Sequence, residues 1–152
     1  MAGELYLVDT NILIRWIQSE SSDFDVVNNA IQRIAMLGAI PCYTSQNLGE
    51  FWNVLTRPTD RNGYGLSVEA ADSRTTDIEA AFRLLPDSPL VHQEWRELLV
   101  RFRVSGVQVH DARLVASMRV HEVRCILTFN TKDFKRFSDI EAVHPLQIVQ
   151  DR

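Results

Sequence analysis

The sequence predicts a three-layer α/β/α fold, in which helices cover both faces of a central parallel sheet of about four to five strands. Short apolar segments alternate along the chain with longer segments whose apolar residues recur at helical spacing. Serine, glycine and proline stand where these longer segments begin or end, as is typical of helix termini. Acidic residues recur beside the expected strand ends, which in a parallel sheet face one edge.

Length and composition favour one soluble domain. The chain has 152 residues, of which 45% are hydrophobic and 24% are charged, so residues 1–152 are expected to form a single domain. No apolar run approaches the ~20 residues of a membrane span, and no secretory leader precedes the first expected strand. We therefore expect a cytoplasmic protein that is not bound to a membrane, with Cys42 and Cys125 reduced and buried in strands.

The first part of the chain predicts two buried strands, each followed by helix. These strands are residues 5–8 and 40–43. A short helix follows the first strand, and a second helix at residues 25–37 ends at Gly38. After the second strand, Ser45 is expected to cap a helix that ends at Pro58.

The remainder predicts two longer helices and three more strands. Glycine, proline, asparagine and aspartate at residues 57–65 predict a flexible loop. A helix is expected at residues 67–84, and Ser88 with Pro89 begins another that ends at Gly106. The further strands are expected at residues 107–109, 125–128 and 146–149, and Asp111 is expected to open another helix after the first of them.

Four acidic residues follow these expected strands, namely Asp9, Glu50, Asp111 and Asp133. Taken alone, Asp9 or Asp111 has a simpler explanation as a helix cap, because aspartate favours that position. Together, however, the four would meet at one edge of the sheet, where carboxylates repel each other unless they share a proton or bind a hard cation. The pattern therefore predicts a Mg²⁺ or Mn²⁺ site that cleaves phosphodiesters.

The net charge of −4 disfavours a protein that coats nucleic acid by bulk electrostatic attraction. If bound cations neutralised the four acids, however, the remaining charge would be zero. Contact with nucleic acid at a local basic patch is therefore compatible with the composition.

Four segments carry a resemblance to a known family. They are Asp9-Thr10-Asn11, Glu50 in its helix, His110-Asp111-Ala112, and the run Thr-Phe-Asn-Thr-Lys-Asp-Phe at residues 128–134. In this order and spacing they resemble the PIN domain, most of all its bacterial VapC-type toxin branch, over residues 5–145. The resemblance implies a divalent-cation-dependent endoribonuclease that cuts single-stranded RNA, a homodimer, and a small antitoxin as the partner of a type II toxin–antitoxin pair.

The resemblance also suggests roles for individual residues. Asp9 and Asp111 are expected to bind the metal directly, Glu50 to bind it or orient the attacking water, and Asp133 with Asn130 to complete the site. Many PIN domains carry aspartate where this chain has Asn130, which adds an amide oxygen but no charge. This departure leaves an alternative open, a non-catalytic PIN-like module that binds RNA or a protein partner.

Substrate contacts are expected from polar and basic residues near these segments, namely Asn11, Thr128, Arg113 and Lys132. His110 is expected to play a structural role, because at the end of a buried strand it would point away from Asp111. Two other kinds of site fit poorly. A dehalogenase-like phosphatase needs a second acid where this chain has Asn11, and a phosphate-loop protein needs glycines after the first strand.

Overall fold

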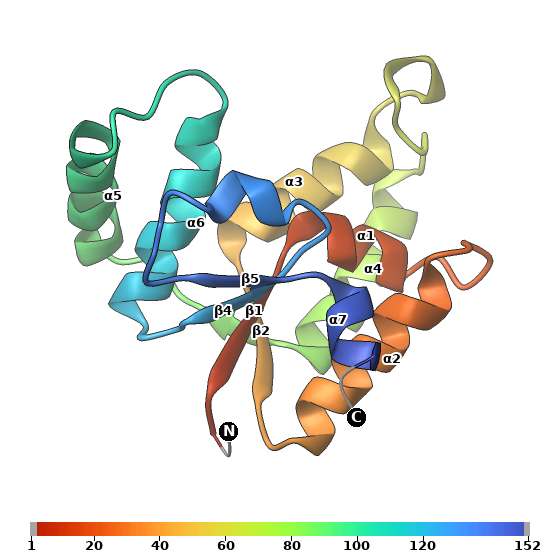
Figure 1. Ribbon diagram of the computed structural model, residues 1–152. Helices are drawn as coiled ribbons and strands as arrows, with labels where there is room; N and C mark the ends of the chain where they lie inside the picture. The colour runs from red at the N-terminus through yellow and green to blue at the C-terminus, as the bar shows by residue number, and fades with distance from the viewer. Residues whose placement is uncertain (1–2, 151–152) are drawn as a thin grey trace.

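The computed structural model describes residues 3–150 and confirms the α/β/α architecture (Figure 1). Five strands form one sheet in the order β3-β2-β1-β4-β5, and every pair of neighbours is parallel. The strands are β1 (Leu5–Val8), β2 (Ile40–Thr44), β3 (Arg83–Leu85), β4 (Cys125–Leu127) and β5 (Glu141–Val143). β1 lies at the centre of the sheet. The chain forms β2 and β3 on one side of it and then β4 and β5 on the other side.

Seven α-helices surround this sheet within residues 3–150. They are α1 (Thr10–Trp16), α2 (Phe24–Met36), α3 (Ser45–Thr56), α4 (Val68–Ala81), α5 (Pro89–Arg101), α6 (Gln108–Val120) and α7 (Pro145–Gln150). Two short 3₁₀ turns, η1 (Thr59–Arg61) and η2 (Thr131–Phe134), lie in the connections. Figure 1 shows α5 and α6 together on one side of the sheet, away from α1, α2 and α7. None of the helices in this described part is long and apolar enough to cross a membrane.

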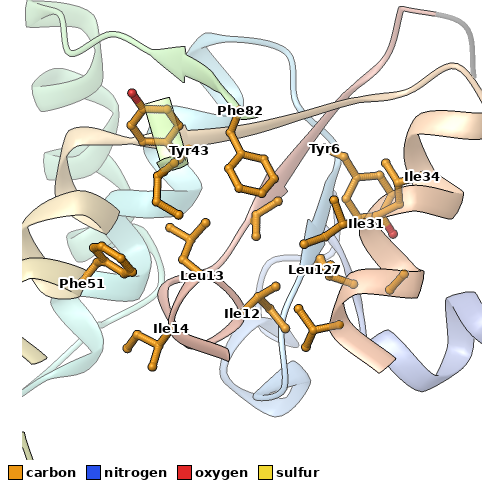
Figure 2. Packing of buried hydrophobic residues seen from close by; sticks show 14 of the residues in the cluster. Tyr6, Ile12, Leu13, Ile14, Ile31, Ile34, Tyr43, Phe51, Phe82 and Leu127 are labelled. Atoms are coloured by element: carbon orange, nitrogen blue, oxygen red, sulfur yellow. The ribbon is translucent and has the colours of Figure 1, made fainter. Parts of the chain in front are cut away.

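Each face of the sheet has its own hydrophobic core, because successive side chains of a strand point to opposite faces. In β1, Tyr6 and Val8 pack with α1, α2, α3 and α4, whereas Leu7 packs with α5 and α6. Figure 2 shows the first of these cores, where side chains from helices and strands meet around Leu13 and Tyr43. The helices on the two faces of the sheet therefore pack into separate hydrophobic cores.

Local sequence signals set several helix ends as expected. Asp9 caps α1 by accepting a hydrogen bond from the Thr10 amide. At the end of α2, Gly38 follows the C-terminal cap Leu37 and has a φ of +88°. The cap of α3 is Thr44, one residue before the expected Ser45. Its hydroxyl accepts a hydrogen bond from the Asn47 backbone amide, and the Asn47 side-chain oxygen accepts one from the Thr44 backbone amide.

The expected strand at residues 107–109 is wrong. These residues begin α6, and Val107 is 82% exposed with no neighbouring strand. Two β-branched residues around Gln108 favour a strand locally, but α5 and α6 form an antiparallel helix pair here, so helix packing decides the conformation. Asp111 consequently lies in the first turn of a helix, not at a strand end.

The expected strand at residues 146–149 is also wrong, since these residues lie in α7. Pro145 fits the first position of that helix because its missing amide hydrogen has no helical partner there. The last strand of the sheet is instead β5, just before this helix. The helix predicted at residues 67–84 ends at Ala81, and the chain then forms β3. Both missed strands lie at sheet edges, where pairing with one neighbour, rather than apolar sequence, defines them.

Residues 57–65 lie between α3 and α4, as expected of a loop, and hydrogen bonds connect this segment back to α3. Its amides at Tyr64 and Leu66 donate to the carbonyls of Val54 and Leu55, at 3.0 and 2.8 Å. Cys42 and Cys125 are free thiols, the first buried and the second half-buried.

Candidate active site at the carboxyl edge of the sheet

The sheet changes direction of winding between β1 and β4, and open α/β sheets bind ligands at such a point, outside the carboxyl ends of the strands. Asp9 follows β1 here and is 8% exposed. Its Oδ1 accepts a hydrogen bond from the Thr10 amide at 2.8 Å, and its Oδ2 accepts one from the Thr128 hydroxyl at 2.7 Å. The carboxylate is therefore fixed in place from both sides.

Thr128 follows β4 and links three segments of the site. Its hydroxyl donates to Asp9 and accepts from the Asn11 side chain at 3.4 Å and the Asn130 amide at 3.0 Å. The Asn11 side chain in turn accepts a bond from the Phe129 amide at 3.4 Å. Since Thr128 is completely buried, it positions Asp9 and does not reach a substrate.

Glu50 projects from α3 and is exposed, with hydrogen-bond donors on both carboxylate oxygens. Its Oε1 accepts from the Gln46 side chain at 3.0 Å, and its Oε2 lies 3.5 Å from the Thr10 hydroxyl. The Thr10 hydroxyl accepts a bond at 3.1 Å from Asn47, which is fully buried. This sequence of bonds connects the helix that carries Glu50 to the turn that carries Asp9.

Asp111 lies half-buried in the first turn of α6. The Gln46 side chain donates to the carbonyl oxygen of His110 at 2.8 Å, so the start of α6 is tied directly to α3. His110 itself is exposed and lies in a helix, so the strand-based reason for its structural role does not apply.

The last segment contributes two exposed residues beside η2. Asn130 immediately precedes this turn, and its backbone is held by Thr128. Asp133 lies inside the turn, where its amide donates to the Asn130 carbonyl at 3.1 Å. Both side chains are exposed, so they lie at the rim of the site.

The electrostatics of Asp9 and Asp111 reflects their burial and the acids near them. Burial, and then the charges of Glu50 and Asp133, raise the pKa of Asp9 to about 6, although hydrogen bonds from Thr128 and Thr10 oppose this change. Burial and the charges of Asp9, Asp133 and Glu50 raise the pKa of Asp111 to about 7. The sequence prediction that these residues come together is consistent with this mutual repulsion.

None of the four acids forms an ion pair with a basic side chain of the described residues. Carboxylate oxygens with uncompensated charge suit a hard divalent cation. Among residues 3–150, no three aspartate, glutamate, histidine or cysteine side chains stand close enough together in this conformation to hold a metal ion.

The residues expected to contact the substrate differ in their exposure and in the protein partners that they already have. Arg113 is half-buried and paired with Asp87 at 3.1 Å, while its second nitrogen donates to Gln46 at 3.2 Å. Lys132 is exposed beside Asp133 in η2. Asn11 is occupied by its bonds to Thr128 and the Phe129 amide.

Sequence reasoning missed two residues of this network, Gln46 and Asn47. A partial signal was present for each. Asn47 follows Thr44 at the spacing of a capping box, and Gln46 precedes Glu50 by four residues, so both lie on one helix face. Their partners in α1 and α6 are set only by the tertiary fold.

Comparisons with known proteins agree with this geometry. The family model described as PIN domain matches residues 6–140, whereas comparison with curated protein sequences gives no significant match. The chain resembles VapBC2 from Rickettsia felis bound to a promoter DNA fragment, with a TM-score of 0.70, 16% identity, and coverage of 92% of this chain and 98% of that chain.

Two further solved structures are similar. DNA-bound VapBC from Salmonella typhimurium gives a TM-score of 0.66 at 15% identity, covering 95% of this chain and 99% of that one. VapC20 from Mycobacterium tuberculosis, described as a sarcin-ricin loop cleaving toxin, gives 0.62 at 17% identity, covering 87% of this chain and 95% of that one. At these identities the likeness shows a shared fold.

Proposed function

The chain belongs to the PIN domain family, and from this premise we propose that it is a divalent-metal-dependent endoribonuclease that cleaves phosphodiester bonds of single-stranded RNA. One observation carries the proposal: burial and the neighbouring acids raise the pKa values of Asp9 and Asp111 near the winding switch of the sheet, and none of the four acids has an ion-pair partner among residues 3–150. We further propose that it is the toxin of a type II toxin–antitoxin pair, because similar structures contain VapC-type proteins.

Mg²⁺ or Mn²⁺ fits this group by its chemistry. Asp9 and Asp111 would hold the cation, with Glu50 and Asp133 as further oxygen ligands; these last two side chains are exposed. When bound, such a cation supplies positive charge beside the phosphate and lowers the pKa of a nearby water.

The residues of this chain prepare the site in separate ways. Thr128 and the Thr10 amide hold Asp9 in one orientation, so its oxygens are arranged before a ligand arrives. Glu50, at the surface, accepts a proton or a hydrogen bond from a water that approaches the phosphate. Asn130 offers an amide oxygen or hydrogen at the rim.

A set of exposed cations beside the acids supports an RNA substrate. They lie at the end of α5 and around η2 and take part in none of the ion pairs of residues 3–150: Arg101, Arg103, Lys132, Lys135 and Arg136. The two segments are joined, because Arg136 donates to the Phe102 carbonyl at 3.4 Å. Phosphates of a single strand would find unpaired positive charge next to the carboxylates.

The remaining elements of the proposal concern assembly and location. We propose one domain over residues 1–152, a homodimer, a small antitoxin as partner, and residence in the cytoplasm. Several similar structures are described as VapBC or FitAB complexes, which supports the antitoxin for this chain.

Cleavage of a labelled single-stranded RNA tests the proposal directly. Activity is expected with Mn²⁺ or Mg²⁺ and absent in EDTA, and Asp9→Ala or Asp111→Ala should reduce kcat by at least 10²-fold. Asp72→Asn in α4, an exposed acid that is not part of the acidic group, is the matched control and should leave the rate unchanged. A rate that survives the double alanine variant would assign the cleavage to a contaminating nuclease.

A second candidate is a non-catalytic PIN-like module that binds RNA or a protein partner. Asn130 favours it, because an amide at the rim adds no negative charge to hold a second cation. Binding of RNA that is indifferent to Mn²⁺, together with no cleavage at any metal concentration, would identify this module instead.

A further inference from the structure

The two proposed metal-binding helices rest on different cores. Glu50 lies on α3, whose Phe51 and Leu55 pack into the core shared with α1 and α4. Asp111 lies on α6, whose Leu114 packs with α5 into the core on the other face of the sheet. No common hydrophobic core therefore fixes the position of Glu50 relative to Asp111.

Gln46 joins these two layers across the edge of the sheet. Its Nε2 donates to Glu50 Oε1 at 3.0 Å and to the His110 carbonyl oxygen at 2.8 Å, beside Asp111. Its Oε1 accepts from Arg113 at 3.2 Å. The Gln46 side chain therefore contacts the Glu50 carboxylate on α3, and on α6 it contacts the backbone of His110 and the side chain of Arg113.

The partners leave one orientation for the Gln46 amide. Two acceptors, a carboxylate oxygen and a carbonyl oxygen, require the two hydrogens of the NH₂ group, and a guanidinium requires the amide oxygen. Arg113 is itself held by Asp87 at 3.1 Å in the connection after β3. Both hydrogens and the oxygen of the Gln46 side-chain amide are therefore hydrogen-bonded to other protein groups.

We infer that Gln46 is a positioning residue that sets the distance between Glu50 and Asp111 and thereby the metal affinity and turnover of the site. This inference rests on the proposed function. Gln46 does not act on the substrate, because its amide is occupied by protein groups. Residues that orient metal ligands change affinity or activity by about 10–100-fold when they are replaced.

Gln46→Met tests the inference, because methionine keeps the length of the side chain and removes its hydrogen bonds. Calorimetric titration should give a Kd for Mn²⁺ about 10-fold above wild type, and kcat should fall by about 10–100-fold with the KM for RNA unchanged. The melting temperature in EDTA should stay within about 2 °C, since Gln46 is half-exposed. Gln32→Met, an exposed position on α2, is the matched control.

A second variant, Gln46→Asn, keeps the amide but is one methylene too short to reach both α6 and Glu50, so it should also weaken Mn²⁺ binding. Wild-type Mn²⁺ affinity in both variants would overturn the inference. Variants that melt at a lower temperature in EDTA but bind Mn²⁺ as wild type does would overturn it as well. Because the titration needs no RNA, absence of Mn²⁺ binding in the wild type would instead count against the proposed function itself.

Discussion

Replacing Asp111 by asparagine should stabilise the metal-free protein at alkaline pH. Burial and the neighbouring carboxylates raise the pKa of Asp111 from 3.8 to about 7 in the folded chain. The favourable contribution of the protonated acid is therefore complete below pH 3.8 and is lost as the pH rises through about 7. Above that pH, the native state carries an ionised Asp111 that the unfolded chain tolerates better.

The size of the effect follows from this pKa. A rise from 3.8 to about 7 corresponds to roughly 4 kcal/mol, at about 1.4 kcal/mol per pKa unit. Asp111 is half-buried, so solvent screening reduces the expected gain to about 1–2 kcal/mol at pH 8. In a domain of this size each kcal/mol moves the melting temperature by about 2–4 °C.

Thermal unfolding in EDTA, followed by circular dichroism between pH 4 and 8, measures this gain. Asp111→Asn should melt higher than wild type at pH 8, and the difference should shrink toward pH 4, where both side chains are neutral. Mn²⁺ should reverse the order, because the wild type binds it better. A variant that is less stable at pH 8, or a difference that does not depend on pH, would refute the electrostatic reasoning. Asp72→Asn should show neither effect.

Further predictions concern the groups around Asp9. Thr128→Val removes the donor to Asp9 and should lower the free energy of unfolding in urea by about 1–3 kcal/mol, because a buried carboxylate and two other polar groups lose their partner. Asn47→Ala removes the capping box of α3 and should cost about 1–2 kcal/mol in the same assay; equal stability would contradict it. Asp133→Asn should weaken Mn²⁺ binding and Asn130→Asp should strengthen it in calorimetric titrations; the opposite order would make Asn130 the functional residue.

Local patterns predicted the central strands and most helix ends correctly. The runs that form β1, β2 and β4 are short, apolar and buried, which is typical of strands covered on both faces. Gly38 ends α2 and Pro89 begins α5, because backbone conformations available to glycine and proline are local properties.

The errors lie where the sequence pattern is ambiguous. β3 and β5 are only three residues long and each begins with a charged residue, and each is a strand because its backbone pairs with one neighbour, β2 or β4. Residues 107–109 and 146–149 are apolar and β-branched, yet packing against other elements makes them helical. Asp111 therefore reaches the site from a helix, although its membership of the acidic group was predicted.

The sequence by itself determined the fold of this protein, and it predicted which acids lie at one edge of the sheet, because strand ends of a parallel sheet share that edge. The tertiary structure alone decided how these acids are held. It placed Gln46 against His110 and Asn47 against Thr10, and it paired Arg113 with Asp87. These partners lie tens of residues apart and on different elements, so no local periodicity relates them, and only the tertiary packing brings their atoms within hydrogen-bonding distance.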